Sequence, residues 1–231
     1  MQTYAPAYYA ALHEGIEVET LDLKTPIDRA RLDGLLLSAD VLITAQRTSA
    51  LARLGLAESL LSTRFPRLLH IAIVGDAGGK SAGHDLTYLA GAGIAQPPTL
   101  PATLLADLAG AERAVSATLL ALLTRERTGR GARVEVSLAA AADAFAAPHR
   151  FGLTGAGALL GGGHPGYNFY RVADGWIALA ALEPHFYKRL VASLACEPSQ
   201  FAAAFAQHPR AHWVAFAATH DIPLAAISES S

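Results

Sequence analysis

The feature that most constrains the fold is a continuous apolar run at residues 68–74, LLHIAIV. A strand that is apolar at nearly every position, not only at alternate ones, is typical of a parallel sheet covered on both faces. Residues 18–23 and 41–44 predict earlier strands, and residues 133–138 predict a later one. Since helical stretches separate these strands, the pattern predicts βαβ units and a mainly parallel sheet.

The helices expected between these strands differ in length. The longest, at residues 104–127, is rich in alanine and leads into Thr128-Gly129-Arg130-Gly131. Glycine at this place can end a helix, and the basic residues complement the negative end of the helix dipole. Three shorter helices are expected at residues 29–38, 50–62 and 139–147.

A glycine-rich segment, residues 152–166, separates this part from a smaller one. Beyond it, residues 167–171 and 176–181 predict a hairpin around Asp174-Gly175, a turn signal. Helices at residues 183–195 and 210–218 would complete a small α+β domain. We therefore expect an α/β large domain at residues 1–151, a linker at 152–166 and a small α+β domain at 167–231.

Composition excludes several classes of protein. The 231 residues carry a net charge of −2, so no global basic field points to nucleic acid. The single cysteine, Cys196, rules out an intramolecular disulfide and a cysteine-based zinc site, and no metal site is expected. No apolar stretch is long enough to span a bilayer, and the first residues lack a signal pattern. A cytoplasmic location is therefore expected. Since 52% of the residues are hydrophobic, we also expect a large subunit interface.

Three short segments place ionisable groups in apolar surroundings, where an uncompensated charge is expensive. They are Gly83-His84-Asp85, Ala106-Asp107-Leu108 and residues 182–187, LEPHFY, which contain Glu183. Each group alone is explained by a helix cap or an ion pair. Together, an imidazole and two carboxylates could exchange protons in one site, if burial and neighbours bring their pKa values towards neutrality.

These segments and others along residues 8–224 resemble the family III CoA-transferases (CaiB/BaiF), on the branch of α-methylacyl-CoA racemase. The Thr128–Gly131 turn and the block at residues 173–187 are the most specific parts. The landmarks are Asp22-Leu23-Lys24 and residues 39–42 (ADVL), 53–56 (RLGL), 83–88 (GHDLTY), 125–138 (RERTGRGARVEVSL) and 170–187 (YRVADGWIALAALEPHFY).

The resemblance implies an acyl-CoA racemase of lipid metabolism that acts as an intertwined homodimer on a coenzyme A thioester, with no bound cofactor. His84 would be the base, and Asp107 would be the acid on the opposite face of the α-carbon. Glu183 would fix the tautomer of His84. Backbone N–H groups at the start of the helix near Asp107 would bind the enolate oxygen. Contacts with coenzyme A are expected from Arg47, Lys24, Asp85 and Tyr88.

Two alternatives remain open. In the transferase branch, the aspartate matching Asp107 attacks the acyl-CoA and carries the acyl group as a mixed anhydride; His84 favours the racemase. The second alternative is a non-catalytic remnant. The family's members are longer, so this chain is expected to be shortened at both ends. Acidic Glu14 and Glu17 stand where the family has a basic patch for phosphates.

Overall fold

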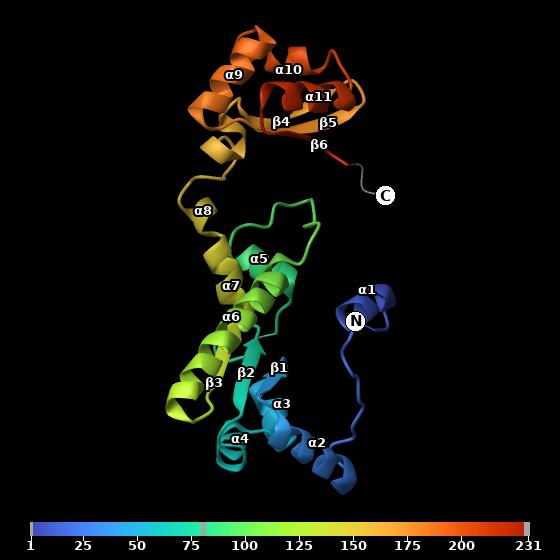
Figure 1. Ribbon diagram of the computed structural model, residues 1–231, viewed down its shortest axis with the longest axis vertical. Coiled ribbons are helices and arrows are strands. Elements are labelled where there is room, and N and C mark those ends of the chain that lie inside the picture. Colours follow the sequence, from blue (N-terminus) through green and yellow to red (C-terminus); the bar gives the residue numbers. More distant parts are fainter. Residues whose placement is uncertain (1, 80–81, 229–231) are drawn as a thin grey trace. The chain divides into compact units, whose positions relative to one another are not determined.

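The computed structural model describes residues 2–79 and 82–228, and it divides into two units that are described separately below (Figure 1). The first unit is Met1–Asp143 and the second is Ala144–Ser231. The division falls before residue 151, where the sequence places the end of the large domain. The role of residues 152–166 as a linker between domains stays a prediction.

The parallel sheet expected from the sequence lies in the first unit. Its strands are β1 (Val41–Thr44), β2 (Leu69–Val74) and β3 (Arg133–Ser137), in the order β1-β2-β3, with both pairs parallel. The central strand β2 is the apolar run, and its Leu69 and Ile71 are completely buried. The neighbouring strands on both sides satisfy the backbone polar groups of β2. Because its two faces are covered, nearly every side chain along it can be apolar.

Helices surround this sheet. The longest, α6 (Leu105–Thr128), packs across β2 and β3, where Ala114 touches the cluster of Ile71 and Val136 (Figure 1). It ends at Gly129 in the left-handed region (φ 70°), as the glycine there predicts. The other helices of this unit are α1 (Pro6–Leu12), α2 (Pro26–Ser38), α3 (Thr48–Arg53), α4 (Glu58–Arg64), α5 (Asp85–Gly91) and α7 (Leu138–Phe145).

Two predictions for this unit are wrong. Residues 18–23 form no strand; the carboxylates of Asp22 and Asp28 accept backbone N–H groups there and build a turn into α2. Residues 50–62 form two helices instead of one. Gly55 takes a positive φ of 67°, which closes α3, and α4 starts at Glu58.

The second unit contains the predicted hairpin. Strands β4 (Tyr167–Val172), β5 (Gly175–Ala180) and β6 (Leu224–Ala226) form an antiparallel sheet in the order β4-β5-β6. Its core holds Ile177, Phe201 and Phe205, all completely buried, and the indole N–H of Trp213 donates to the Phe205 carbonyl at 2.9 Å. Its helical segments are α8 (Ala147–Arg150), η1 (Leu159–Gly163), α9 (Pro184–Leu194), η2 (Pro198–Gln200), α10 (Phe201–Phe205) and α11 (Arg210–His220).

The glycine-rich segment is folded onto itself within this second unit. The Leu160 N–H donates to the Leu153 carbonyl, and the Gly161 N–H donates to the Ala158 carbonyl, both at 2.9 Å. A Cβ built on Gly161 would overlap the carbonyl oxygen of Gly155. Glycine is therefore required here because two stretches of backbone approach each other closely.

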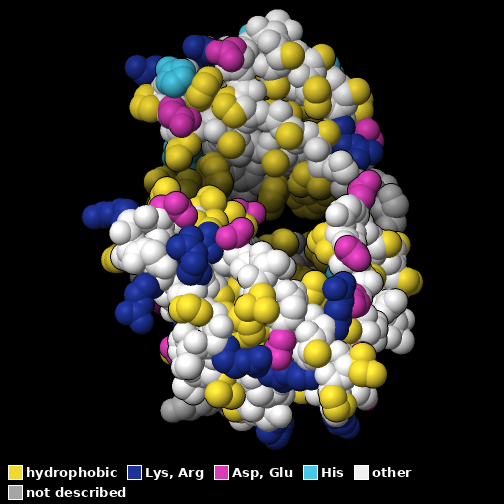
Figure 2. Space-filling model, turned by 60° about the horizontal axis from the view of Figure 1, so that its bottom comes forward, with side chains coloured by type: hydrophobic (Ala, Val, Ile, Leu, Met, Phe, Trp, Pro, Cys, Tyr) yellow, Lys and Arg dark blue, Asp and Glu magenta, His cyan; other side chains and the backbone are white. Residues whose placement is uncertain are grey.

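The surface carries charges of both signs. On the face shown in Figure 2, basic and acidic side chains are scattered in small groups among hydrophobic ones. Among the described residues, no helix combines the length and apolar character needed to cross a membrane.

Arg125 is the buried cation that ties α6 to the sheet, with only 6% of its surface exposed. Its guanidinium donates to the carbonyls of Asp40 and Arg67, at 3.3 and 3.2 Å, and to the Asp40 carboxylate at 2.7 Å. We expect Arg125→Ala to lower the free energy of unfolding of the first unit by about 2–3 kcal/mol, because charged groups form the stronger hydrogen bonds.

The control for this substitution is Asp40→Asn. The Asp40 side chain is 74% exposed, so losing its charge should cost less than about 1 kcal/mol. Urea unfolding followed by far-UV circular dichroism reports both units. Trp176 and Trp213 both lie in the second unit, so their fluorescence follows the unfolding of that unit. The urea midpoint that it gives should be the same in both variants as in the wild type. Equal losses of unfolding free energy in Arg125→Ala and Asp40→Asn would contradict the role of Arg125 as the cation that ties α6 to the sheet.

Candidate active site

A cavity of about 540 Å³ opens in the first unit at the carboxyl ends of the three parallel strands. Ala45 follows β1, Gly75 follows β2 and Leu138 follows β3, and all three line it. This edge is where open α/β sheets generally bind ligands, because the segments that leave the strands gather there. The remaining lining residues are Arg47, Ile73, Val74, Gly79, Ala82, Gly83, His84, Tyr88, Asp107 and Ala111.

Helices α5 and α6 bring the predicted imidazole and one carboxylate to this cavity. His84 precedes the first residue of α5, and Asp107 lies in the first turn of α6. The two helices pack together through Leu89 and Ala106 (Figure 1). The Thr87 hydroxyl holds the His84 backbone, since it accepts from the His84 N–H at 3.0 Å and donates to the His84 carbonyl at 2.8 Å. The side chains of His84 and Asp107 thus serve one cavity.

Asp85 has a buried carboxylate that joins the two helices, with 6% of its surface exposed. Its Oδ1 accepts from the backbone N–H of Ala106 at 2.7 Å and of Asp107 at 3.2 Å. Leu104, the residue before α6, offers no side-chain cap, so Asp85 supplies it from another helix. The Ala106 and Asp107 N–H groups therefore do not bind an enolate oxygen as expected, because Asp85 occupies these two.

The surroundings of Asp107 favour its protonated form. The group is half-buried, and burial raises the pKa of its carboxyl; the negative charge of Asp85 raises this pKa further, while His84 lowers it. Burial also raises the pKa of the Tyr88 phenol, with added effects of Asp107 and Asp76. A carboxyl that keeps its proton at higher pH can act as a general acid.

Glycines give Tyr88 its place on the cavity wall. A Cβ built on Gly75 would overlap the Tyr88 hydroxyl, and one built on Gly83 would lie 2.5 Å from the Tyr88 ring. The phenol therefore packs closely against two stretches of backbone. Sequence analysis missed this role of Gly75, although a glycine directly after a buried strand is a signal of close approach.

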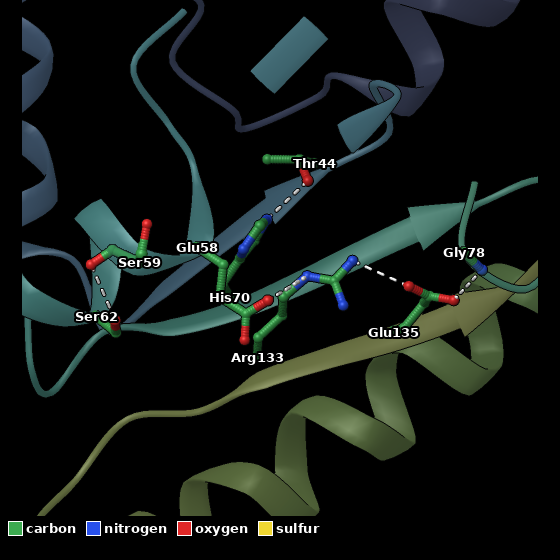
Figure 3. A network of polar contacts seen from close by, with 8 residues as sticks. All are labelled: Thr44, Glu58, Ser59, Ser62, His70, Gly78, Arg133 and Glu135. Atoms are coloured by element: carbon green, nitrogen blue, oxygen red, sulfur yellow. Dashed lines mark hydrogen bonds and ion pairs between the residues drawn. The ribbon is translucent and has the colours of Figure 1, made fainter. Parts of the chain in front are cut away.

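A polar network holds the loop after β2, another part of the wall (Figure 3). The Glu135 carboxylate of β3 accepts from the Gly78 N–H at 2.7 Å and pairs with Arg133 at 3.0 Å. The bond from Gly78, then that from Arg133, lowers the pKa of Glu135. The sequence offered one signal for this residue, a charged side chain inside a strand. In the same view, buried His70 bonds to the Thr44 hydroxyl at 2.9 Å.

The predicted site residues that belong to the first unit fall into three groups. Arg47, His84, Tyr88 and Asp107 line the cavity, and Asp85 lies buried behind His84 and Asp107. Lys24 is exposed in the turn before α2 and is not among the described residues that line the cavity, so its contact with coenzyme A stays a prediction.

Glu183 belongs to the second unit, where it is exposed directly before α9. Its backbone carbonyl accepts from the Tyr187 N–H at 3.0 Å. A pairing with His84 would join the two units and stays a prediction.

Comparison with known proteins identifies the family. The model of CoA-transferase family III matches residues 1–231. The chain belongs to this family. Among curated members of CoA-transferase family III, the human alpha-methylacyl-CoA racemase is 31% identical over 229 residues, which cover 84% of this chain and 60% of that protein. The succinate–glutarate CoA-transferase of Agrobacterium fabrum is 29% identical over 206 residues, covering 82% of this chain and 52% of that one.

Solved structures share the fold. Rv3272 from Mycobacterium tuberculosis superposes with a TM-score of 0.78 at 23% identity, over 92% of this chain and 68% of that one. A CaiB/BaiF family protein from Brucella suis gives a TM-score of 0.73 at 22% identity, over 91% and 66% of the two chains. The chain spans about 60% of the length of the racemase that it matches.

The raised pKa of Asp107 has a consequence for stability. A carboxyl whose pKa rises on folding destabilises the folded state as pH rises through the folded pKa, and has no such effect below the unfolded pKa near 3.8. We expect Asp107→Asn to raise the melting temperature of the first unit at about pH 8, and the gain to disappear at about pH 3.5.

Asp33→Asn is the control with the opposite sign. The hydrogen bond from Arg64 lowers the pKa of Asp33, so its stabilising effect is present above the unfolded pKa and is lost in acid. This variant should melt earlier than the wild type at about pH 8. Thermal scans at both pH values test the pair, and an Asp107→Asn variant that is less stable than the wild type at about pH 8 would contradict the electrostatics.

Proposed function

We propose that this chain inverts the α-carbon of a 2-methylacyl-CoA by two-base proton transfer, as an acyl-CoA racemase. One observation carries the proposal: His84 and Asp107 line the same cavity, and the surroundings of Asp107 favour a carboxyl that holds a proton. An imidazole and a protonated carboxyl are the base and the acid that such an inversion needs.

The reaction starts when the neutral imidazole of His84 removes the α-proton of the thioester. The electron pair of the broken C–H bond moves into an enolate, and His84 becomes an imidazolium. Asp107 then gives its proton to the opposite face of the α-carbon and becomes a carboxylate. The reverse direction starts from the Asp107 carboxylate. Because both groups exchange protons with water between turnovers, the new C–H bond carries a solvent-derived hydrogen.

The substrate is a coenzyme A thioester, and the protein needs no bound cofactor for this chemistry. Arg47 on the cavity wall would pair with a phosphate of coenzyme A, with Lys24 as a further cation. Tyr88 shapes the wall near the thioester. Glu183 would hydrogen-bond His84 and fix its tautomer.

A CoA-transferase is the second candidate. The observation that favours it is the similarity to the Agrobacterium fabrum transferase, which is 29% identical to this chain. In this mechanism the Asp107 carboxylate attacks the carbonyl carbon of the thioester, the C–S bond breaks, the CoA thiolate leaves, and the acyl group stays on Asp107 as a mixed anhydride. The raised pKa of Asp107 opposes it, because a protonated carboxyl is a poor nucleophile.

Deuterium uptake separates the two activities. We expect wild-type protein in D₂O to place deuterium at the α-carbon of 2-methylacyl-CoA, followed by mass spectrometry. His84→Ala and Asp107→Asn should each slow this exchange by about 10²-fold or more, the scale of a positioned acid or base. His13→Ala and Asp40→Asn, which change residues outside the cavity, should leave the rate unchanged.

The transferase gives a different pattern. Wild-type protein would transfer the acyl group to an acceptor acid without α-deuterium, and Asp107→Asn would abolish the transfer. Calorimetry tests the non-catalytic alternative. A chain with no affinity for CoA or acetyl-CoA and no exchange above buffer would be such a remnant. If CoA binds, Arg47→Ala should weaken binding about tenfold or more, and Arg53→Ala should not.

We also propose that the chain forms a homodimer, intertwined through residues 152–166. Helix α6 exposes Leu119 by 58% and both Leu120 and Leu123 by 67%. Such a row of leucines on a 24-residue helix is typical of a surface that another chain covers.

Light scattering at micromolar concentration should give the mass of a dimer. Leu119→Glu should shift it towards the monomer, because a charge in an apolar interface is expensive to bury. Thr124→Glu, a charge on another exposed position of α6, is the matched control. A wild-type monomer at this concentration would contradict the proposal.

A further inference from the structure

Asp85 is a buried carboxylate whose position the mechanism above leaves unexplained. A charge with 6% of its surface exposed is retained in folded proteins when hydrogen bonds compensate its desolvation. Here the compensation comes from two backbone N–H groups of α6, one of which belongs to Asp107 itself. Asp85 also directly follows His84 in the chain. A single side chain thus touches the backbone of one proposed catalytic residue and adjoins the other.

The start of α6 depends on this contact. The first N–H groups of a helix have no intrahelical partner, and a side chain from the preceding residue usually caps them. Leu104 cannot do this. Asp85 does so from 21 residues earlier in the chain, at distances of 2.7 Å to Ala106 N and 3.2 Å to Asp107 N. The first turns of α5 and α6 are therefore fixed to each other at the point where both meet the cavity.

We propose that Asp85 is a positioning residue of this site: its buried carboxylate joins the first turns of α5 and α6, holding His84 and Asp107 across one cavity, and places a negative charge beside Asp107. The effect of Asp85 on catalysis rests on the proposed function. Its contact with α6 and the effect of its charge on Asp107 do not depend on that function. It replaces the predicted contact between Asp85 and coenzyme A, since a buried carboxylate that already accepts two hydrogen bonds is a poor partner for phosphate.

The charge of Asp85 acts with a definite sign. It opposes ionisation of Asp107 and so supports the burial that raises the pKa of that carboxyl, while His84 acts in the opposite direction. Among the residues that the structure describes, the other titratable or charged groups that share the cavity with Asp107 are His84 and Tyr88 at α5 and Arg47 before α3, and Asp76 in the loop after β2 acts on Tyr88. Removal of the Asp85 charge alone should therefore make Asp107 a stronger acid that loses its proton at lower pH.

The test separates this charge from the hydrogen bonds. Asp85→Asn keeps an oxygen acceptor for the α6 amides and removes the charge; Asp85→Ala removes both. The titration of Asp107 is followed by carbon NMR of its carboxyl group, assigned with Asp107→Asn. We expect the Asp107 titration to move to lower pH in Asp85→Asn. The α-deuterium exchange near pH 7 should fall about tenfold or more, because less of the acid is protonated.

Asp40→Asn is the matched control, since it removes a carboxylate bonded at the other end of α6. It should leave both the Asp107 titration and the pH profile of exchange unchanged. An unchanged Asp107 titration in folded Asp85→Asn would overturn the proposal. If the Asp107 titration shifts in Asp85→Asn but the wild type shows no exchange activity, the positioning role is supported and the proposed function is defeated. The two failures are therefore distinguishable.

A measurement on the wild type covers variants that fail to fold. First-turn amides of a helix normally exchange with solvent quickly because they lack an intrahelical partner. The Ala106 amide should exchange more slowly than the His185 amide, which holds the same second position in α9, where no side chain caps the helix. Equal exchange at these two amides would overturn the contact between Asp85 and α6.

Discussion

The first unit depends on the burial of one strand, β2, between two parallel neighbours. Leu69 and Ile71 are completely buried, and β1 and β3 flank β2 in register. Parallel strands end at the same edge of a sheet, so the segments that follow them meet there. The cavity lined by Ala45, Gly75 and Leu138 is the result. The polar groups of the site lie at this edge because the side chains along β2 itself are buried and almost all apolar.

Small residues and one buried charge shape the site above this sheet. Gly75 and Gly83 leave space for the Tyr88 ring, and Asp85 joins α5 to α6. The same packing that withdraws Asp107 from water brings the Asp85 charge near it, and both effects favour the protonated carboxyl. The position and the acidity of Asp107 thus both depend on Asp85. Asp85→Asn can separate the two effects because it keeps an acceptor for the α6 amides and removes the charge.

Membership of CoA-transferase family III does not by itself decide between proton transfer and acyl transfer. A relative named as a racemase is 31% identical to this chain, and one named as a transferase is 29% identical. The two reactions require opposite protonation states of Asp107: proton transfer needs a carboxyl that can donate a proton, and acyl transfer needs a carboxylate that can attack the thioester. The protonation state of one side chain, set by its surroundings, is therefore the property that distinguishes them on a shared fold.

The sequence alone determined those elements whose signal is local. The apolar run predicted β2, the glycine at 129 predicted the end of α6, and Asp174-Gly175 predicted the hairpin. His84 and Asp107 were found through their resemblance to family motifs. The strand expected at residues 18–23 failed because alternation shows that a segment can pair but not that a neighbouring strand is there to pair with.

Only the tertiary structure decided what Asp85 does and which amides remain free at α6. Its partners lie 21 and 22 residues away along the chain, and no local pattern records them. The raised pKa of Asp107 has the same origin, since burial and neighbouring charge belong to the packed unit. Periodicity carries information about which face of an element is buried; hydrogen bonds and charges between distant segments exist only once the chain has brought them together.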